Sequence, residues 1–567
     1  MKVVIIGGVA GGATAAARLR RLDEHAEIIV LERTGYVSYA NCGLPYYIGN
    51  VITDRAKLTL QTPQSFLRRF NIDIRVNQEA ARINRAEKTV EVKNLSDGTT
   101  YIESYDKLIL SPGAKAVIPD LPGVDSDKIF TLRTVEDTFA IYDYIEKTQA
   151  KNAVVVGAGF IGLEMAENLV ERGIGVTVLQ RPAHVMATLD GDIAALLHNT
   201  LRDGGINLRL RMDVTGFETT DAGITTFAKT LEQNDAPTEN FDADLVILAI
   251  GVRPESSLAK EAGLELGIRD SIKTDDHMRT SDPDIYAAGD AVQVKNWATG
   301  SDALISLAGP ANKQGRIIAD NICGIESTFK GSQGSSVMKA FDMTVATTGI
   351  SAEMAQREGI EYDYIVIRPG AHAGYYPGGG NITLKVLFRP SDGLILGAQA
   401  IGKMGVEKRI DVIATAMHWR ATAHDLVELD LSYAPPYSSA KDPVNMAGFT
   451  IENIVEGRMK QVQWSNVENL PENTIVLDTR TQKEWDKGHI EGAMLIPVDE
   501  LRGRLDELPR DKKMYVHCQS GLRSYIACRI LLQEGFDVAN VAGGYGFYDE
   551  VNKGASVNPE QVGDCGL

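Results

Sequence analysis

The sequence predicts an α/β fold, because two segments repeat the same order of strand, glycine-rich turn, helix and second strand. The first runs from Val3 to Glu32 and the second from Ala153 to Arg181. In each, a short apolar run leads into closely spaced glycines and then into a helical stretch. This order is typical of a Rossmann-like βαβ unit that holds the pyrophosphate of a dinucleotide. The length of 567 residues leaves room for three or four domains.

The first unit is predicted as a strand over 3–6, a helix over 13–20 and a strand over 28–31. Its turn is Gly7-Gly8-Val9-Ala10-Gly11-Gly12, in which Val9 replaces the middle glycine of the dinucleotide fingerprint. Glu32 follows the glycines by about twenty residues, where an acidic side chain accepts a hydrogen bond from a ribose hydroxyl. A generic glycine-rich turn without a ligand is the alternative.

The second unit has an intact fingerprint, Gly157-Ala158-Gly159-Phe160-Ile161-Gly162. Its second strand, over 176–179, ends at Gln180, where an acidic residue would select NADH. Gln180 can still hydrogen-bond a ribose diol, whereas Arg181 suits the 2′-phosphate of NADPH. The coenzyme preference stays open at this point, with a slight lean to NADH.

Cys42 follows the first unit by about ten residues, within reach of the redox end of a bound dinucleotide. Pro45 and the apolar run after it predict the first turn of a helix. We therefore expect Cys42 at a helix N-terminus, where the dipole and free amides favour the thiolate. A buried structural cysteine is the alternative.

Composition limits the function classes. The chain is 44% hydrophobic and 24% charged, and its formal net charge of -18 argues against a general nucleic-acid binder. Five scattered cysteines imply no disulfide framework, and no Cys/His cluster has metal-ligand spacing. Because we find neither a signal peptide nor a membrane-spanning apolar run, we expect a cytoplasmic enzyme with no membrane or nucleic-acid partner.

Three arginines lie on the predicted first helix. Arg18 and Arg21 are three residues apart and share a face with Thr14, which suits a phosphate-bearing substrate lying along the helix. For Arg20 we expect a solvated basic face.

A third segment, residues 280–290, is predicted as a strand that ends in Gly289-Asp290. Two dinucleotide units followed by this motif resemble the two-dinucleotide-binding flavoprotein disulfide reductases. The resemblance implies FAD in the first site, NAD(P)H in the second, and Asp290 on the ribityl chain of the flavin. Residues 245–254 resemble the crossover of that family back to the FAD domain. The implied cofactor-binding positions are Gly7, Ala10, Gly11, Gly12, Glu32, Arg33, Asn41, Pro112, Gly113, Arg133, Gly157, Gly159, Gly162, Glu164, Gln180, Gly251, Gly289, Asp290 and Ala308.

Within that family, residues 38–46 resemble the branch with a single redox cysteine, which contains CoA-disulfide reductases, NADH oxidases and NADH peroxidases. Oxidase and peroxidase members carry a histidine at the position of Ala10. Without this acid/base group, a thiol leaving group is favoured over peroxide. An NADH oxidase or peroxidase that cycles Cys42 through sulfenic acid remains the alternative. A redox sensor or sulfur-relay scaffold without enzymatic activity is a further alternative.

Residues 370–378 and 431–445 resemble the dimerisation domain of the CoA branch. By this resemblance, Tyr375 and Tyr433 reach from the partner subunit of a homodimer to the sulfur atoms at Cys42. Their hydroxyls can hydrogen-bond a departing thiolate or donate its proton. Interface packing alone is the alternative for each. The CoA site carries over as Thr14, Arg18, Arg21, Ser38, Asn41, Asn312 and Lys441.

The C-terminal hundred or so residues resemble a single rhodanese domain. A strand over 514–517 delivers Cys518 into a short loop, and a helix follows over 525–528. Such a loop surrounds the sulfur with main-chain amides and suits a thiolate or a persulfide. Arg523 adds positive charge, and the loop is one residue shorter than in the related phosphatases, which points to sulfur transfer. An inert module is the alternative; Cys528 is predicted in the core, and Cys565 is unassigned.

These observations predict six segments: an FAD-binding domain over 1–112 and again over 246–325, an NAD(P)H-binding domain over 113–245, an α+β dimerisation domain over 326–450, a linker over 451–468, and an α/β rhodanese domain over 469–567. The function expected is a FAD-dependent NAD(P)H reductase of CoA-persulfide, polysulfide and CoA-disulfide. Cys42 is the expected nucleophile, with Cys518 as a carrier of sulfane sulfur from a donor such as polysulfide or thiosulfate.

Overall fold

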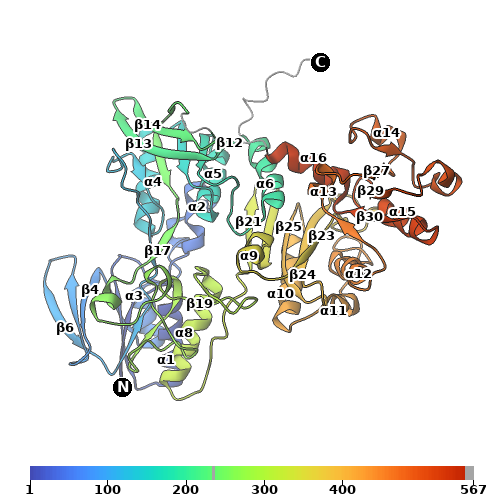
Figure 1. Ribbon diagram of the computed structural model, residues 1–567. Helices are drawn as coiled ribbons and strands as arrows, with labels where there is room; N and C mark the ends of the chain where they lie inside the picture. The colour runs from blue at the N-terminus through green and yellow to red at the C-terminus, as the bar shows by residue number, and fades with distance from the viewer. Residues whose placement is uncertain (233–235, 556–567) are drawn as a thin grey trace. The chain divides into compact units, whose positions relative to one another are not determined.

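The computed structural model describes residues 1–232 and 236–555 and confirms the predicted α/β class (Figure 1). The chain folds as two compact units. The first holds residues 1–182 and 205–334, and the second holds residues 183–204 and the chain from residue 335 onward. These units are coarser than the six predicted segments, whose boundaries stay predictions.

The first sheet of unit 1 is parallel, with the strand order β18-β7-β1-β2-β3. Its strands are β1 (Lys2–Ile6), β2 (Glu27–Glu32), β3 (Asp73–Val76), β7 (Lys107–Leu110) and β18 (Ile285–Ala287). Helices α1 (Ala10–Leu22) and α8 (Ala308–Ile322) pack side by side (Figure 1). A Cβ on Gly315 would lie 2.3 Å from the carbonyl oxygen of Gly11, so this close approach needs glycine.

The strand predicted from residue 280 forms only over β18. Before it, Asp282 accepts a hydrogen bond from the main-chain N–H of Asp284 at 3.0 Å, which makes a turn around Pro283. The other elements of this part are β4 (Gln78–Asn84), β5 (Thr89–Asn94), β6 (Thr100–Ser104), β8 (Ala114–Ala116), β17 (Val252–Pro254), β19 (Val294–Lys295), β20 (Asp302–Ala303), α2 (Leu44–Ile48), α3 (Pro63–Phe70) and α7 (Ser257–Glu261).

The second sheet of unit 1 is also parallel, with the order β12-β11-β10-β16-β9. Its strands are β9 (Ile129–Phe130), β10 (Asn152–Val156), β11 (Gly175–Gln180), β12 (Asn207–Leu210) and β16 (Leu245–Leu248). An antiparallel sheet of β13 (Met212–Thr220), β14 (Gly223–Thr230) and β15 (Glu239–Ala243) accompanies it, with α4 (Val135–Thr148) and α5 (Phe160–Glu171). The continuous apolar runs of β10 and β16 are buried, as is usual for strands of a covered parallel sheet.

Unit 2 contains an antiparallel sheet of order β21-β22-β25-β24-β23. Its strands are β21 (Ser336–Ala340), β22 (Met343–Gly349), β23 (Asp363–Ile367), β24 (Ile382–Phe388) and β25 (Ile395–Gly402). Its helices are α9 (Ala352–Arg357), α10 (Val406–His418), α11 (Ala423–Glu428) and α12 (Pro443–Val455). Apolar side chains from β24, β25, α10 and α12 form one core cluster.

Unit 2 also contains a parallel sheet of order β26-β30-β29-β27-β28. Its elements are β26 (Gln461–Val462), β27 (Thr474–Asp478), β28 (Met494–Leu495), β29 (Lys513–His517), β30 (Val538–Val541), α13 (Trp464–Glu468), α14 (Gln482–Trp485), α15 (Leu522–Gln533) and α16 (Gly544–Ala555). Helix α6 (Gly191–Asp203) lies against α16, both labelled in Figure 1. A Cβ on Gly554 would lie 1.9 Å from the carbonyl oxygen of Ala195, so α16 needs glycine there.

Within the described residues, no helix is long and apolar enough to cross a membrane. The same residues hold no group of three or more His, Cys, Asp or Glu side chains that is placed to bind a metal ion.

Candidate active sites

The turn after β1 has two positions where only glycine fits. Gly7 has a φ of +97°, and a Cβ there would lie 2.0 Å from the carbonyl oxygen of Ser111. A Cβ on Gly12 would lie 1.9 Å from the carbonyl oxygen of Gly7. The main chain therefore folds closely at the carboxyl ends of β1 and β7, and α1 begins there with Ala10 and Gly11.

Glu32 at the end of β2 is buried and faces this turn. One of its oxygens accepts a hydrogen bond from the Gly8 N–H at 2.8 Å, and the other accepts from the Thr34 N–H at 2.9 Å. Arg133 pairs with Asp290 at 3.2 Å, so these two predicted positions are also brought together. The remaining first-site positions lie in loops, in short 3-10 turns or at the start of α8: Arg33, Asn41, Pro112, Gly113, Gly289 and Ala308.

The turn after β10 repeats this geometry. Gly157 has a φ of +101°, and a Cβ on Gly162 would lie 2.0 Å from the carbonyl oxygen of Gly157. Gly159 is the N-cap of α5 and has open space on its Cβ side, as does Gly251, which has a φ of +118°. Gln180 accepts from the Ala158 N–H at 2.9 Å, the contact that Glu32 makes to Gly8. The second turn therefore has a neutral amide where the first has a carboxylate.

Cys42 lies in a single turn of 3-10 helix, Asn41–Gly43, directly before α2. It is exposed and has no disulfide partner among the described cysteines. Helix α2 packs closely on α5: a Cβ on Gly49 would lie 2.2 Å from Asn168 Oδ1, and Arg172 donates to the Ile48 carbonyl at 2.8 Å. The Cys42 turn is thus held against the helix that begins at the second glycine turn.

The expected stabilisation of the Cys42 thiolate by a helix dipole is wrong for this arrangement. Although the residue is exposed, partial desolvation by surrounding atoms raises the pKa of the Cys42 thiol. The nearby carboxylates of Glu164 and Asp290 raise it further, and Arg133 acts in the opposite direction. Pro45 lies in the first turn of α2 as predicted, but that helix has only five residues and begins at Leu44. Its dipole is correspondingly small.

Glu164 offers a test of this electrostatic coupling. Burial, with repulsion from Glu167, raises the pKa of Glu164 to about 7, so it carries a full negative charge only above neutral pH. In Glu164→Gln, we expect the pH midpoint of Cys42 alkylation by iodoacetamide to move to lower pH, measured by mass spectrometry of the Cys42 peptide. The control is Glu171→Gln, which changes an exposed residue on the same helix. An unchanged or higher midpoint contradicts the coupling.

Two residues predicted to bind CoA meet directly. The Thr14 hydroxyl on α1 donates to Asn312 Oδ1 on α8 at 2.6 Å. One turn further along α1, Arg18 pairs with Asp320 at 2.8 Å, so a carboxylate already balances its charge, whereas Arg21 is exposed. Of the other predicted CoA positions, Ser38 lies in the loop that leads to Cys42, Asn41 begins the 3-10 turn that contains Cys42, and Lys441 is exposed in unit 2 just before α12.

Arg20 does not lie on a solvated face, which corrects the expectation from the sequence. It is 5% exposed. Its guanidinium donates to five main-chain carbonyls: Asp23, Glu24, Ala26, Phe70 and Asn71. Arg20 therefore fixes the end of α1 to the segment before β3, and this role is structural.

The two predicted tyrosines are also brought together. The hydroxyl oxygens of Tyr375 and Tyr433 are 2.9 Å apart, and the residues are 77% and 46% exposed. They come from the loops before β24 and before α12. A hydrogen-bonded pair of exposed phenols can accept or deliver a proton at a bound sulfur atom.

Arg409 on α10 holds these two loops together. Its terminal nitrogen donates to the Ala371 carbonyl and to Asp442 Oδ2, each at 3.0 Å, and to the Ser438 hydroxyl at 3.1 Å. Ala371 precedes Tyr375 in one loop, whereas Ser438 and Asp442 belong to the loop of Tyr433. Arg409 and Asp442 are 1% and 2% exposed. The relative position of the tyrosines thus depends on a buried ion pair.

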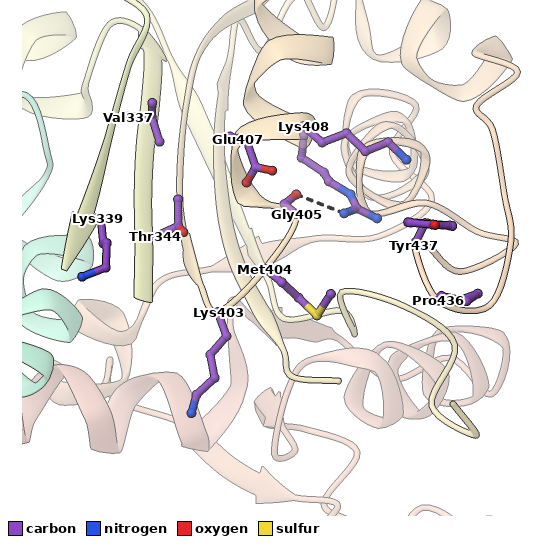
Figure 2. A pocket seen from close by; sticks show the side chains of 11 residues that line it. Val337, Lys339, Thr344, Lys403, Met404, Gly405, Glu407, Lys408, Pro436 and Tyr437 are labelled. Atoms are coloured by element: carbon purple, nitrogen blue, oxygen red, sulfur yellow. Dashed lines mark hydrogen bonds between the residues drawn. The ribbon is translucent and has the colours of Figure 1, made fainter. Parts of the chain in front are cut away.

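A cavity of about 620 Å³ lies at β21, β22 and the start of α10 (Figure 2). Lys339, Lys403 and Lys408 make its wall basic. The dashed line in Figure 2 ends at the Gly405 carbonyl, which accepts a hydrogen bond from Arg409 at 3.0 Å. The residues that line it include Tyr437 but none of the positions predicted for catalysis or CoA.

Cys518 follows β29 and is fully buried. Its Sγ accepts a hydrogen bond from the Gly521 N–H at 3.1 Å and lies 3.4 Å from the Ser524 hydroxyl. Gly521, with a φ of +102°, is the N-cap of α15, so the loop closes onto a helix N-terminus as predicted. Cys528 lies in the core as expected, and Cys565 falls outside the described residues.

Arg523 is not a free positive charge at this loop. Its two terminal nitrogens donate to Glu484 at 2.8 and 2.6 Å. This bidentate pair, together with hydrogen bonds from Thr481, lowers the pKa of Glu484 to about 2, against a smaller opposing effect of burial. The charge that the sequence predicted at the sulfur is therefore balanced by a residue thirty-nine positions earlier.

Residues 1–315 match the family described as "Pyridine nucleotide-disulphide oxidoreductase", and residues 336–443 match its dimerisation domain. The chain belongs to this family of oxidoreductases. Residues 464–548 match the rhodanese-like domain, so this oxidoreductase carries a C-terminal rhodanese-like domain, as the resemblance implied.

The similar proteins described next cover 80% to 97% of this oxidoreductase. The Coenzyme A disulfide reductase of Staphylococcus haemolyticus is 38% identical over 454 residues, which are 80% of this chain and 100% of that protein. The crystal structure of reduced Bacillus anthracis CoADR-RHD has a TM-score of 0.94 and 48% identity over 97% of this chain and 98% of that one. A NAD-dependent persulfide reductase from A. fulgidus has a TM-score of 0.89 and 37% identity over 97% and 100%.

The family implies FAD and NAD(P)H, and the first site fits a flavin dinucleotide. The two glycines after β1 let the main chain approach a pyrophosphate, and α1 begins beside it. The Nε of Arg133 is buried and has no hydrogen-bond partner among the described residues, so this atom has a donor to offer beside Asp290. In the second site, the open space at Gly159 leaves room for a nucleotide beside the main chain.

Sequence reasoning missed two residues that shape the sites, Arg409 and Glu484. Glu484 carried one local signal, since Thr481 and Glu484 have the spacing of a capping box, and the structure forms that box. No local signal marks Arg409, because its partners lie about thirty to forty positions away in two separate loops.

Proposed function

We propose that this chain works as a homodimeric, FAD-dependent NADH:CoA-persulfide, polysulfide and CoA-disulfide reductase, with Cys518 carrying sulfane sulfur. The observation that carries the proposal is Cys42: an exposed thiol without a disulfide partner among the described residues, held against the nucleotide-binding helix α5. With no second cysteine to pair with, the other sulfur of the reacting disulfide comes from the substrate.

The reaction begins when the Cys42 thiolate attacks a sulfur–sulfur bond. Attack on the inner sulfur of CoA-persulfide gives a Cys42–CoA disulfide and hydrosulfide, and attack on the outer sulfur gives a Cys42 persulfide and CoA thiolate. Bound FAD supplies the two electrons from NADH that cleave this new bond. The sum is one NADH and one proton consumed for each CoA and hydrogen sulfide released. With CoA-disulfide, two CoA thiols are released instead.

The pair of tyrosines supports a role in proton transfer to the departing thiolate, because their hydroxyls hydrogen-bond to each other in an exposed position. Exposed aromatic residues on the same unit, Tyr376 and Tyr437 among them, support the view that this surface faces a second copy of the chain. A homodimer would bring the tyrosines to the partner's site, as the sequence resemblance implies.

The second turn supports NADH as the preferred coenzyme. Arg181, the residue suited to a 2′-phosphate, pairs with Asp213 at 2.8 Å. A carboxylate beside that position disfavours a phosphate group, whereas the Gln180 amide accepts or donates a hydrogen bond to a ribose diol.

The proposal is tested by detecting the covalent intermediate between Cys42 and CoA. When the FAD-loaded protein, with Cys42 as a free thiol and the flavin oxidised, is mixed with CoA-disulfide without NADH, we expect a CoA adduct on the Cys42 peptide by mass spectrometry and release of one CoA. Cys323→Ser, which changes a half-buried cysteine, should still form the adduct. An adduct found only on Cys323 or Cys518 contradicts the proposal.

A further inference from the structure

Two arginines at the Cys518 loop each form an ion pair with a carboxylate. Arg480 is 2% exposed, donates to both oxygens of Asp478 from its Nε at 3.1 and 2.9 Å, and lies over the Tyr545 ring at 4.0 Å. Arg523 donates to both oxygens of Glu484. Each guanidinium at this loop therefore has its own carboxylate, and the charges cancel.

The histidine beside Cys518 adds no charge at neutral pH. His517, directly before Cys518, is fully buried, and burial lowers its pKa to about 4, although Asp478 acts in the opposite direction. The Cys518 sulfur is thus held by the Gly521 N–H and the Ser524 hydroxyl, both neutral donors. Such a site holds one negative charge, on a thiolate or a persulfide, through dipoles.

Sulfur donors differ in charge. Thiosulfate is a dianion and leaves as the sulfite dianion, so its transfer to a thiolate brings three negative charges together. The persulfide group of an alkyl persulfide carries at most one. A dianion approaching a thiolate requires an uncompensated cation nearby, because the Coulomb repulsion is strong in a partly desolvated loop.

We propose that Glu484, by neutralising Arg523, makes Cys518 selective for alkyl persulfides and against thiosulfate. This inference rests on the proposed role of Cys518 as a sulfur carrier. In the favoured reaction, the Cys518 thiolate attacks the outer sulfur of R–S–SH, the S–S bond breaks, R–S⁻ leaves as a thiolate, and Cys518–S–SH forms. Sulfur is transferred without net oxidation or reduction.

The ion pair of Glu484 and Arg523 is accessible to solvent, so the selectivity can be tested by removing its carboxylate. Their side chains are 29% and 32% exposed, so Arg523 is within reach of a substrate anion once its carboxylate partner is removed. Glu484→Gln removes the negative charge and keeps a side chain of the same size. Thr481 still caps α14 by accepting from the N–H of residue 484.

The experiment measures kcat/KM of the full FAD-loaded protein for thiosulfate and for glutathione persulfide, with cyanide as acceptor and Cys518→Ser as the blank. Glu484→Gln should raise the thiosulfate-to-persulfide ratio by at least about tenfold, through a lower KM for thiosulfate. In Glu484→Gln/Arg523→Gln, this gain should disappear. Glu507→Gln, which removes a bidentate carboxylate from Arg504 elsewhere in the same domain, is the control and should leave the ratio unchanged.

Two outcomes overturn the inference while the carrier role stands. One is a wild-type protein that uses thiosulfate as well as persulfide, and the other is an unchanged ratio in Glu484→Gln. A separate result, no Cys518-dependent transfer from either donor, overturns the carrier role itself and the inference with it.

Discussion

Cys42→Ser should lower NADH-dependent turnover of CoA-persulfide and CoA-disulfide by at least about a thousandfold, as expected for the loss of a nucleophile. A serine hydroxyl at this position cannot form the mixed disulfide with CoA. The coenzyme turns do not involve the thiol: Glu32, Gln180 and the glycines around them keep their contacts. Reduction of the bound flavin by NADH should therefore persist and can be followed by flavin absorbance.

Cys323→Ser is the matched control, because Cys323 is the other cysteine of unit 1. It should keep full turnover. If Cys42→Ser turned over CoA-persulfide at a rate near that of the control, the sulfur chemistry would have to reside elsewhere, and Cys518 would be the first place to look.

The second large effect concerns stability. Arg409→Met should lower the free energy of unfolding of unit 2 by about 3–5 kcal/mol, because it leaves the Asp442 carboxylate buried without its cation. Thermal unfolding followed by circular dichroism measures the loss. Arg389→Met removes a partner of Asp392 on an exposed surface and should cost far less, because exposed ion pairs contribute little to stability.

The contacts of Asp442 explain why the loss of Arg409 should be costly. Burial opposes its ionisation, but hydrogen bonds from the Val444 N–H and the Ser438 hydroxyl, together with Arg409, hold the pKa of Asp442 below its ordinary value. A carboxylate with a lowered pKa stabilises the fold above its unfolded pKa, and this contribution is lost as the pH falls through the folded value. The cost of Arg409→Met should therefore shrink in acid.

A double replacement separates the ion pair from simple packing. Arg409→Met/Asp442→Leu should recover a large part of the lost stability, since replacing both partners of a buried pair with apolar groups is often nearly neutral. Equal unfolding temperatures for Arg409→Met and Arg389→Met would contradict the role given to the pair. The tyrosine loops would then have to be held by other contacts.

The sequence predicted the features that depend on local order. The two glycine turns, β1, β10 and the loop after β29 form where the apolar runs and glycines indicated, because steric limits at Gly7, Gly12, Gly157 and Gly162 act within a few residues. Cys42 and Cys518 could be singled out for the same reason.

Features that depend on distant partners could not be predicted. Arg20 looked like a surface residue because its acceptors at Phe70 and Asn71 lie fifty positions away. The charge of Arg523 looked free because Glu484 comes from another helix, and the pKa of Cys42 depends on Glu164, from the second nucleotide-binding segment. In each case tertiary contacts set the electrostatic state of the side chain.

The central claim is that Cys42 reduces sulfur bound to CoA. Its most direct test is anaerobic NADH consumption by the wild-type protein, compared side by side with CoA-persulfide, CoA-disulfide, polysulfide and hydrogen peroxide. We expect rapid turnover of CoA-persulfide, with one sulfide and one CoA released for each NADH, and slow turnover of peroxide. Peroxide as the best substrate, with little sulfide formed from CoA-persulfide, would contradict it.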